Sequence, residues 1–182
     1  MSDKEILNLC LNESTLEKGF KILVAAYSKK IYLHVRRMVV DHDDANDVVQ
    51  NCFIKVWKAL PHFREDSQLY TWIYRIASNE SITFLNNKNK KNGHSFSGIE
   101  KYIENIKEDV WMDSEDVMNQ LQIAIDSLPA KQKQVFIMRY YDEMKYDEME
   151  QVLGTSAGAL KASFHHAVRK VEEIMRAGLN LG

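Results

Sequence analysis

The stretch that most constrains the fold of this chain is residues 146–171, YDEMEQVLGTSAGALKASFHHAVRKV. Two runs of apolar residues at helical spacing flank the short segment Gly154, Thr155 and Ser156. A glycine suits the left-handed conformation that ends a helix, and a serine can accept a hydrogen bond from the free backbone N–H groups that open the next one. The stretch therefore predicts a helix-turn-helix, in which two helices meet at a sharp angle.

The second of these helices is predicted to bury one face and to leave a small, cationic face for a partner. The inward side is apolar and holds Leu160, Phe164, Ala167, Val168 and Val171. The outward side holds Gly158, Ala162, His165, His166 and Arg169, with Lys161 and Lys170 at its flanks. Small residues allow close approach, and cations can contact phosphates or base edges of duplex DNA. A DNA-reading helix is the favoured interpretation, and a solvated helix of a bundle is the alternative.

Composition favours an all-helical protein, because 182 residues include only two Pro and seven Gly. The formal net charge of −2 is unusual for a free-standing DNA binder, whose affinity comes largely from neutralising phosphates. Either DNA is not the partner, or another protein supplies much of the affinity. Two cysteines are too few for a disulfide framework or a zinc site, and neither a signal peptide nor a membrane-spanning run is visible. We expect a cytoplasmic protein with no metal, no cofactor and no membrane contact of its own.

Residues 41–63, DHDDANDVVQNCFIKVWKALPHF, predict a helix that is capped by Asp43 or Asp44 and stops near Pro61. Its apolar stripe faces a core. The opposite face is polar apart from one residue, and it carries Asp47, Gln50, Asn51, Ile54 and Lys58. Ile54 is either a lone exposed hydrophobe or the apolar centre of a protein-binding patch with a polar rim. The residues alone leave both interpretations open.

Another helix is predicted from Leu69 to about Asn87, after a short polar connection. Tyr70, Tyr74 and Arg75 point away from the side that we expect to pack inward. Exposed aromatic rings among basic and amide groups suit single-stranded nucleic acid, because unstacked bases need a flat ring and phosphates need positive charge. An ordinary surface with aromatic edges remains the alternative.

Residues 92–113 lose the helical pattern and are acidic, which predicts a linker between two domains, 1–91 and 114–182. Ser114, Glu115 and Asp116 open the first helix of the second domain, and Pro129 marks the start of the next. The predicted fold is therefore all-α, with two small helical domains. We find no Gly-rich phosphate loop, no HExxH and no nucleophile elbow, so we do not expect an enzyme or any catalytic residue.

Three blocks together resemble the extracytoplasmic-function (ECF) group of bacterial RNA polymerase sigma factors. They are residues 41–63, residues 69–85 (LYTWIYRIASNESITFL) and residues 128–171, and the resemblance covers roughly residues 20 to 175. It implies that 1–91 is sigma region 2 and 114–182 is sigma region 4. The implied function is to bind core RNA polymerase, read the minus-thirty-five element as duplex and melt the minus-ten element. The implied partners are the β′ clamp helices and β subunit of the polymerase, promoter DNA and an anti-sigma factor.

The resemblance also implies roles for individual residues. Contact with the β′ clamp helices falls to Asp47, Gln50, Asn51 and Ile54. Contact with the minus-ten element falls to Phe63, Arg64, Ser67, Tyr70, Thr71, Tyr74, Arg75, Asn79, Lys88, Lys90 and Lys91. Contact with the minus-thirty-five element falls to Ser156, Gly158, Lys161, Ala162, His165 and Arg169.

The chain departs from the pattern of that group at several positions that would contact DNA. Asparagines stand at 86, 87 and 89, where basic residues are usual, and Glu65 and Asp66 stand where Gly and a basic residue are commoner. Ala159 and Ser163 replace the usual Thr and Arg of the DNA-reading helix. The promoter sequence is therefore left open. A DNA-binding regulator that does not engage polymerase and a module that only sequesters a protein partner remain the alternatives.

Overall fold

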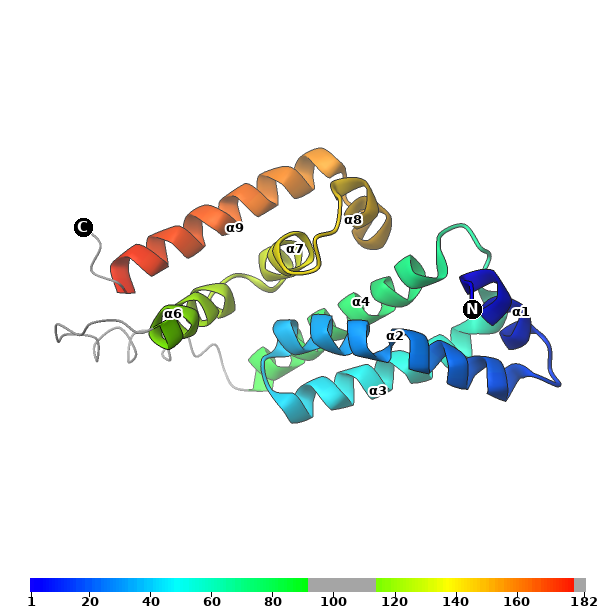
Figure 1. Ribbon diagram of the computed structural model, residues 1–182. Helices are drawn as coiled ribbons and strands as arrows, with labels where there is room; N and C mark the ends of the chain where they lie inside the picture. The colour runs from blue at the N-terminus through cyan, green and yellow to red at the C-terminus, as the bar shows by residue number, and fades with distance from the viewer. Residues whose placement is uncertain (92–113, 179–182) are drawn as a thin grey trace.

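The computed structural model describes residues 1–91 and 114–178, and within these ranges every regular element is a helix (Figure 1). The first range contains α1 (Asp3–Leu11), α2 (Leu16–Val39), α3 (His42–Ala59), the short 3-10 helix η1 (Leu60–His62) and α4 (Leu69–Lys91). The second contains α6 (Ser114–Asp126), α7 (Ala130–Tyr140), α8 (Tyr146–Leu153) and α9 (Ala157–Gly178). The all-α class is confirmed for these residues. The predicted linker, 92–113, lies outside them.

The first range forms a bundle of three long helices, α2, α3 and α4, with α1 packed near the beginning of α2 (Figure 1). Its centre is apolar, since Leu23, Ile31, Val56 and Ile73 are fully buried. Burial of each such side chain contributes on the order of 1.5–3 kcal/mol relative to exposure. The bundle therefore gives α3 and α4 fixed positions, and these two helices carry most of the residues with expected roles.

The cap of α3 differs from the one predicted. Asp41, rather than Asp43 or Asp44, accepts hydrogen bonds from the backbone N–H groups of both those residues, at 2.9 and 3.0 Å. A carboxylate at this position satisfies donors that have no partner inside the helix. The prediction missed it because three acidic residues in four can each play this part, and only the backbone shows which one does.

The second range forms a smaller unit, in which α6 and α7 pack along α9 and α8 crosses near the beginning of α9 (Figure 1). Ile125, Phe136, Ala167 and Val171 are buried together in its core. Pro129 immediately precedes α7, as its fixed φ and missing N–H favour. Among the helices of the described ranges, we find none with both the length and the apolar character to cross a bilayer.

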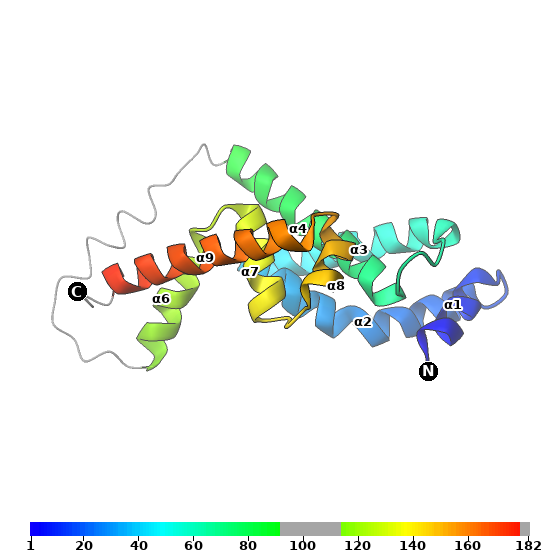
Figure 2. The ribbon, with the colours of Figure 1, turned by 90° about the horizontal axis from the view of Figure 1, so that it is seen from above.

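The two helical units pack directly against each other. Helices α7 and α8 lie beside α2 and α4, as the two perpendicular views show (Figures 1 and 2). The larger hydrophobic core runs through both, because Val35 and Ile73 of the first unit share it with Met138, Met149 and Leu160 of the second. The sequence did not predict how the two units are arranged. The structure shows them in direct contact, which we call the closed arrangement.

Candidate nucleic-acid and polymerase interfaces

The turn between α8 and α9 has the geometry that the sequence predicted. Gly154 takes the left-handed conformation with φ 64°, and its N–H donates to the carbonyl of Glu150 at 2.8 Å. The hydroxyl of Ser156 accepts from the backbone N–H of Ala159 at 3.4 Å, at the start of α9. Both ends of the turn are thus held by local hydrogen bonds. The predicted helix-turn-helix is present.

The outward face of α9 is exposed over its first four turns. Leu160, Ala167 and Val171 are buried below it. The residues expected to read duplex DNA are all exposed, and they are Ser156, Gly158, Lys161, Ala162, His165 and Arg169. The Arg169 side chain is 62% exposed and lies 3.9 Å from Glu173, a distance at which an exposed ion pair contributes little. Arg169 is therefore available to an anionic partner, and a contact with DNA stays a prediction.

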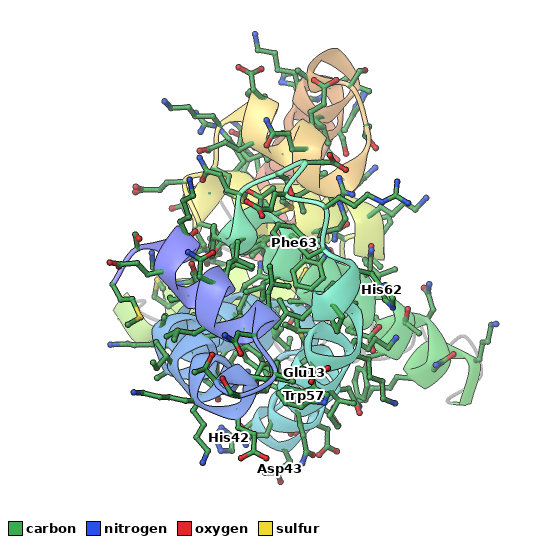
Figure 3. The ribbon with its side chains drawn as sticks, turned by 90° about the vertical axis from the view of Figure 1, so that its right-hand side faces the viewer. Glu13, His42, Asp43, Trp57, His62 and Phe63 are labelled. Atoms are coloured by element: carbon green, nitrogen blue, oxygen red, sulfur yellow. The ribbon has the colours of Figure 1, made fainter. Side chains whose placement is uncertain are left out.

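The polar face of α3 is also exposed, with an apolar centre. Asp47, Gln50, Asn51 and Ile54 all lie on the surface, and Ile54 is 45% exposed. Sequence reasoning missed Trp57, which is 37% exposed beside them (Figure 3). The Trp57 ring packs edge-on against Phe20, with ring centroids 4.8 Å apart. Its spacing of three from Ile54 was the available signal. The two apolar side chains form a surface patch bordered by polar groups.

The connection before α4 carries the first residues expected at the minus-ten element. Phe63 is half-buried (Figure 3). It packs against Trp72, with ring centroids 4.8 Å apart. Arg64 is exposed and Ser67 is half-buried. Glu65 takes a positive φ of 56°, a conformation that disfavours most side chains other than glycine. A glycine, which the sequence analysis noted as commoner near this position, would adopt this positive φ without strain.

The middle of α4 is covered rather than exposed, and the expectation that its aromatic side faces solvent is wrong for this arrangement. Tyr74 is 1% exposed and Thr71 is 7% exposed, while Tyr70 is half-buried. Burial raises the pKa of Tyr70 to about 12. Arg75 and Asn79, by contrast, are exposed. The reason is tertiary. His34 of α2 packs against the Tyr74 ring, with ring centroids 4.3 Å apart, and α7 and α8 also lie against α4.

The far end of α4 stays open. Lys88 and Lys90 are exposed, and the Lys88 ammonium lies 2.6 Å from the Asp44 carboxylate. Lys91 is the last residue of the helix, and its side chain lies outside the described part. An exposed pair such as Lys88 and Asp44 separates easily. These lysines can therefore reach a phosphate backbone in the closed arrangement.

A buried polar cluster joins the two units, and no sequence pattern indicated it. Asp142, in the α7–α8 connection, lies 2.9 Å from Nδ1 of His34 and 3.0 Å from Nη1 of Arg37, and it accepts a hydrogen bond from the Tyr74 hydroxyl. His34 is fully buried, and its Nε2 lies 3.0 Å from the hydroxyl of Ser78. More than 60 residues separate Asp142 from each of its partners, so no local pattern could have found the cluster.

The cluster perturbs the ionisation of its members. Burial by itself raises the pKa of Asp142, but the hydrogen bonds from His34 and Tyr74 and the charge of Arg37 outweigh burial and lower it. The pKa of Tyr74 rises well above its usual value, through burial first and the neighbouring carboxylate second. Asp142 therefore stays ionised and Tyr74 stays a hydrogen-bond donor at neutral pH.

Arg75 makes a second contact between the units. Its Nε donates to the carbonyl of Val152 at 3.0 Å, and its Nη2 donates to the carbonyl of Gln151. These carbonyls belong to the last turn of α8, where they have no partner inside the helix and where the helix dipole favours a cation. Arg75, one of the residues expected to contact the minus-ten element, thus caps the first helix of the helix-turn-helix.

The cysteines and the potential metal ligands form no chemical site within residues 1–91 and 114–178. Cys10 and Cys52 are both buried free thiols, and burial raises the pKa of Cys52 to about 12. Such a thiol is a poor nucleophile and a poor metal ligand. Within residues 1–91 and 114–178, His, Cys, Asp and Glu side chains nowhere gather into a set of three or more that could bind a metal.

Comparison with known proteins matches both parts of the chain to one family. Residues 23–91 match Sigma-70 region 2, and residues 118–171 match Sigma-70, region 4. The chain is 30% identical over 167 residues to the ECF RNA polymerase sigma-E factor of Escherichia coli strain K12, covering 86% of each chain. It is 25% identical over 169 residues to the RNA polymerase sigma-H factor of Pseudomonas aeruginosa, covering 88% of each.

Solved structures show the same fold at lower identity. CnrH, in complex with the cytosolic domain of CnrY, aligns with a TM-score of 0.69 at 19% identity, covering 96% of this chain and 97% of CnrH. The sigma factor RpoE of Bartonella quintana, in complex with the anti-sigma factor NepR, aligns with a TM-score of 0.64 at 19% identity, covering 87% of this chain and 98% of RpoE. At this identity the likeness establishes the fold alone.

Proposed function

Because the chain belongs to the ECF group of the sigma-70 family, we propose that it binds core RNA polymerase, reads a minus-thirty-five duplex and melts a minus-ten element. Membership itself makes it a promoter-specific transcription initiation factor without catalysis of its own. The proposal assigns residues 1–91 to core binding and the minus-ten element, residues 114–182 to the minus-thirty-five element, and residues 92–113 to the linker. One observation carries it: region 2 offers an exposed apolar-centred patch and region 4 offers an exposed cationic helix on the same chain.

The α3 patch fits a protein partner better than a nucleic acid. Ile54 and Trp57 supply apolar surface that gains from burial, and Asp47 would repel phosphates. We assign the patch, with Gln50 and Asn51 on its rim, to the β′ clamp helices. The β subunit is the further polymerase partner expected for the factor.

The α9 face fits duplex DNA. Gly158 and Ala162 keep its surface low enough for the helix to enter a major groove, and Lys161, His165 and Arg169 present hydrogen-bond donors. We assign this face, with Ser156 at its start, to the minus-thirty-five element. The modest charge of the whole chain is compatible with this role, since core polymerase holds both DNA-reading segments near the promoter and raises their effective concentration.

The connection before α4 and the α4 helix are assigned to the single-stranded minus-ten element. Phe63, Tyr70 and Tyr74 supply aromatic rings for unstacked bases, and Arg64, Arg75 and the lysines at the end of α4 supply positive charge. Ser67, Thr71 and Asn79 add polar groups to this surface.

An anti-sigma factor is the third proposed partner, a proposal supported by the complex of RpoE with NepR.

The proposal is tested by multi-round transcription from a promoter library, using purified core polymerase with and without the protein. We expect transcripts that share a pair of upstream elements only when the protein is present. Ile54→Asp should abolish them, because a buried carboxylate without a partner disfavours the polymerase contact. Met118→Asp likewise replaces an exposed apolar side chain by aspartate, at a residue of α6 that is 59% exposed, and it should leave transcription intact.

Other outcomes would replace the proposal. Binding to core polymerase without initiation would favour a module that sequesters a protein partner. A failure to bind core polymerase, together with tight unaided binding to a palindromic duplex, would favour a stand-alone DNA regulator. Full activity of Ile54→Asp would overturn the assignment of the α3 patch.

A further inference from the structure

A cavity of about 330 Å³ lies on the inner side of the helix-turn-helix, lined by residues of α4, α7, α8, α9 and the turn before α9. Its volume is near the lower end of the roughly 300–1,000 Å³ that small-molecule sites in proteins occupy. Of the residues assigned to polymerase or promoter DNA, Asn79 is the only one among the described residues that line it. The proposed function therefore gives this cavity no role.

Gln134 stands out in the wall of the cavity, because it is a buried polar side chain without a partner. The residue is 5% exposed, and its Nε2 has no hydrogen-bond partner among residues 1–91 and 114–178. Every other buried side-chain nitrogen or oxygen of these ranges has one. A buried donor without an acceptor lowers stability, and the terminal torsion of a glutamine rotates easily. A small rotation can therefore bring this amide to an acceptor in the cavity.

The other polar groups of the wall also suit a ligand that accepts hydrogen bonds. Lys131 adds an exposed ammonium group, Asn79 adds an amide, and Thr155 and Ser163 add hydroxyl groups. Of the described residues that line the cavity, none is acidic. An anionic head group thus meets one cation and several donors, with no carboxylate in the wall to repel it.

The rest of the wall is apolar. Leu160 is 1% exposed and Val135 is 5% exposed, while Ile82 and Leu153 are half-buried. An apolar ligand body gains free energy by leaving water for such a surface. Inorganic anions have no such body, and amines carry the wrong charge for a site beside Lys131. The wall therefore favours a small organic acid.

We propose that this cavity binds a small monocarboxylate with an apolar body. A carboxylate oxygen accepts a hydrogen bond from Nε2 of Gln134, and the ammonium group of Lys131 balances the charge. The apolar body packs against Leu153 and Leu160. This site goes beyond the proposed function and does not depend on it.

Titration of the isotope-labelled, full-length protein, followed by nuclear magnetic resonance, tests the site. The probes are hexanoate, 1-hexanol and hexylamine, which share one alkyl chain and differ in the head group. The side-chain amide of Gln134 gives a signal of its own, which is identified by its loss in Gln134→Leu. We expect hexanoate to shift this signal to saturation and to bind at least about tenfold more tightly than hexylamine. Acetate, which lacks the apolar body, should bind at least about tenfold more weakly than hexanoate.

Variants of the wall separate a ligand-binding role of Gln134 from a structural one. Gln134→Leu should weaken hexanoate binding about tenfold, yet leave the urea midpoint of unfolding the same or higher, because an apolar group replaces an unpaired donor. A glutamine needed for folding would lower that midpoint. Lys131→Ala should weaken binding of hexanoate and leave binding of 1-hexanol unchanged. Lys145→Ala is the matched control, since it removes an exposed lysine of the same unit that does not line this cavity.

Three results would overturn the site. The first is a parent protein that binds none of the probes, and the second is one that binds hexylamine as tightly as hexanoate. The third is hexanoate binding that stays unchanged in both Gln134→Leu and Lys131→Ala, because the ligand would then lie elsewhere. Circular dichroism shows whether each variant keeps its helices, and Lys131→Ala changes only an exposed side chain.

The titration uses neither polymerase nor promoter DNA, so its outcome is independent of the transcription assay. Failure of promoter-specific transcription would remove the proposed function and leave the carboxylate site standing. Normal transcription without selective binding of hexanoate would do the reverse.

Discussion

At the scale of single residues, Arg169 shows how an exposed cation gains a role only with a partner. Within residues 1–91 and 114–178 its single ionic neighbour is Glu173 at 3.9 Å, and both side chains are more than half exposed. Such a pair contributes little to folding. The guanidinium can contribute more to DNA binding, because its paired N–H donors can reach two acceptors on the edge of a guanine.

We expect Arg169→Ala to weaken binding of the polymerase complex to its own promoter by about 1–3 kcal/mol, the range for loss of a base contact. Binding is measured by fluorescence anisotropy at fixed salt. Arg176→Ala, an exposed arginine in the last turn of the same helix, is the matched control and should have a much smaller effect. An equal loss on every duplex would make Arg169 a phosphate contact instead.

Asp142 makes folding stability depend on pH. Burial raises its pKa, but His34, Tyr74 and Arg37 outweigh burial and hold the pKa below the usual 3.8. Because the folded pKa is lower than the unfolded one, the carboxylate stabilises the folded state above the unfolded pKa, and this stabilisation is lost as pH falls through the folded pKa.

We expect Asp142→Ala to lower the free energy of unfolding by about 2 kcal/mol at neutral pH, the scale of a hydrogen bond to a charged group. The difference from the parent protein should shrink as pH falls below about 4, where the carboxyl of the unfolded chain is protonated. Urea denaturation of both proteins across this range measures it. A difference that does not change with pH would contradict the role of the ionised carboxylate.

At the scale of elements, the angle between α8 and α9 depends on the backbone at one position. Gly154 adopts φ 64°, and a Cβ placed there would meet no other atom within 4 Å. A substitution therefore costs free energy through backbone conformation and not through a clash. Gly158 has equally open surroundings but lies within α9, where a side chain favours the helix.

These two glycines should respond in opposite directions. Gly154→Ala is expected to lower the free energy of unfolding by about 1 kcal/mol, because an L-residue disfavours the left-handed region. Gly158→Ala is expected to raise it by about 0.5 kcal/mol, since alanine restricts the unfolded chain and suits a helix. Urea denaturation gives both values. The same sign for both variants would show that backbone conformation at residue 154 does not decide stability.

At the scale of the whole molecule, features that depend on neighbouring residues could be predicted from the sequence, whereas contacts between segments far apart in the chain could not. Helical periodicity predicted which side of α9 is exposed and which residues of α3 reach the surface, because both depend on neighbours three or four positions away. Turn chemistry predicted Gly154 and Ser156 for the same reason. Burial of Tyr74 was missed, because the residues it contacts are distant in sequence: His34 lies 40 residues before it and Asp142 lies 68 residues after it.

The shared core implies that the two units unfold as one body in the free protein. Val35 and Ile73 pack in one cluster with Met149 and Leu160, so separating the units exposes apolar surface as well as the polar cluster around Asp142. Hydrogen exchange near the conditions of unfolding should therefore give α3 and α9 the same opening free energy.

In Asp142→Ala, which keeps the apolar contacts but loses the central carboxylate, the smaller unit should open at lower free energy than the bundle of α2, α3 and α4. Exchange mass spectrometry resolves peptides from each helix, with Asp147→Ala as the control. Unequal opening free energies in the parent protein would show that contact between the two units adds no cooperativity, and the shared core would then be too weak to couple them.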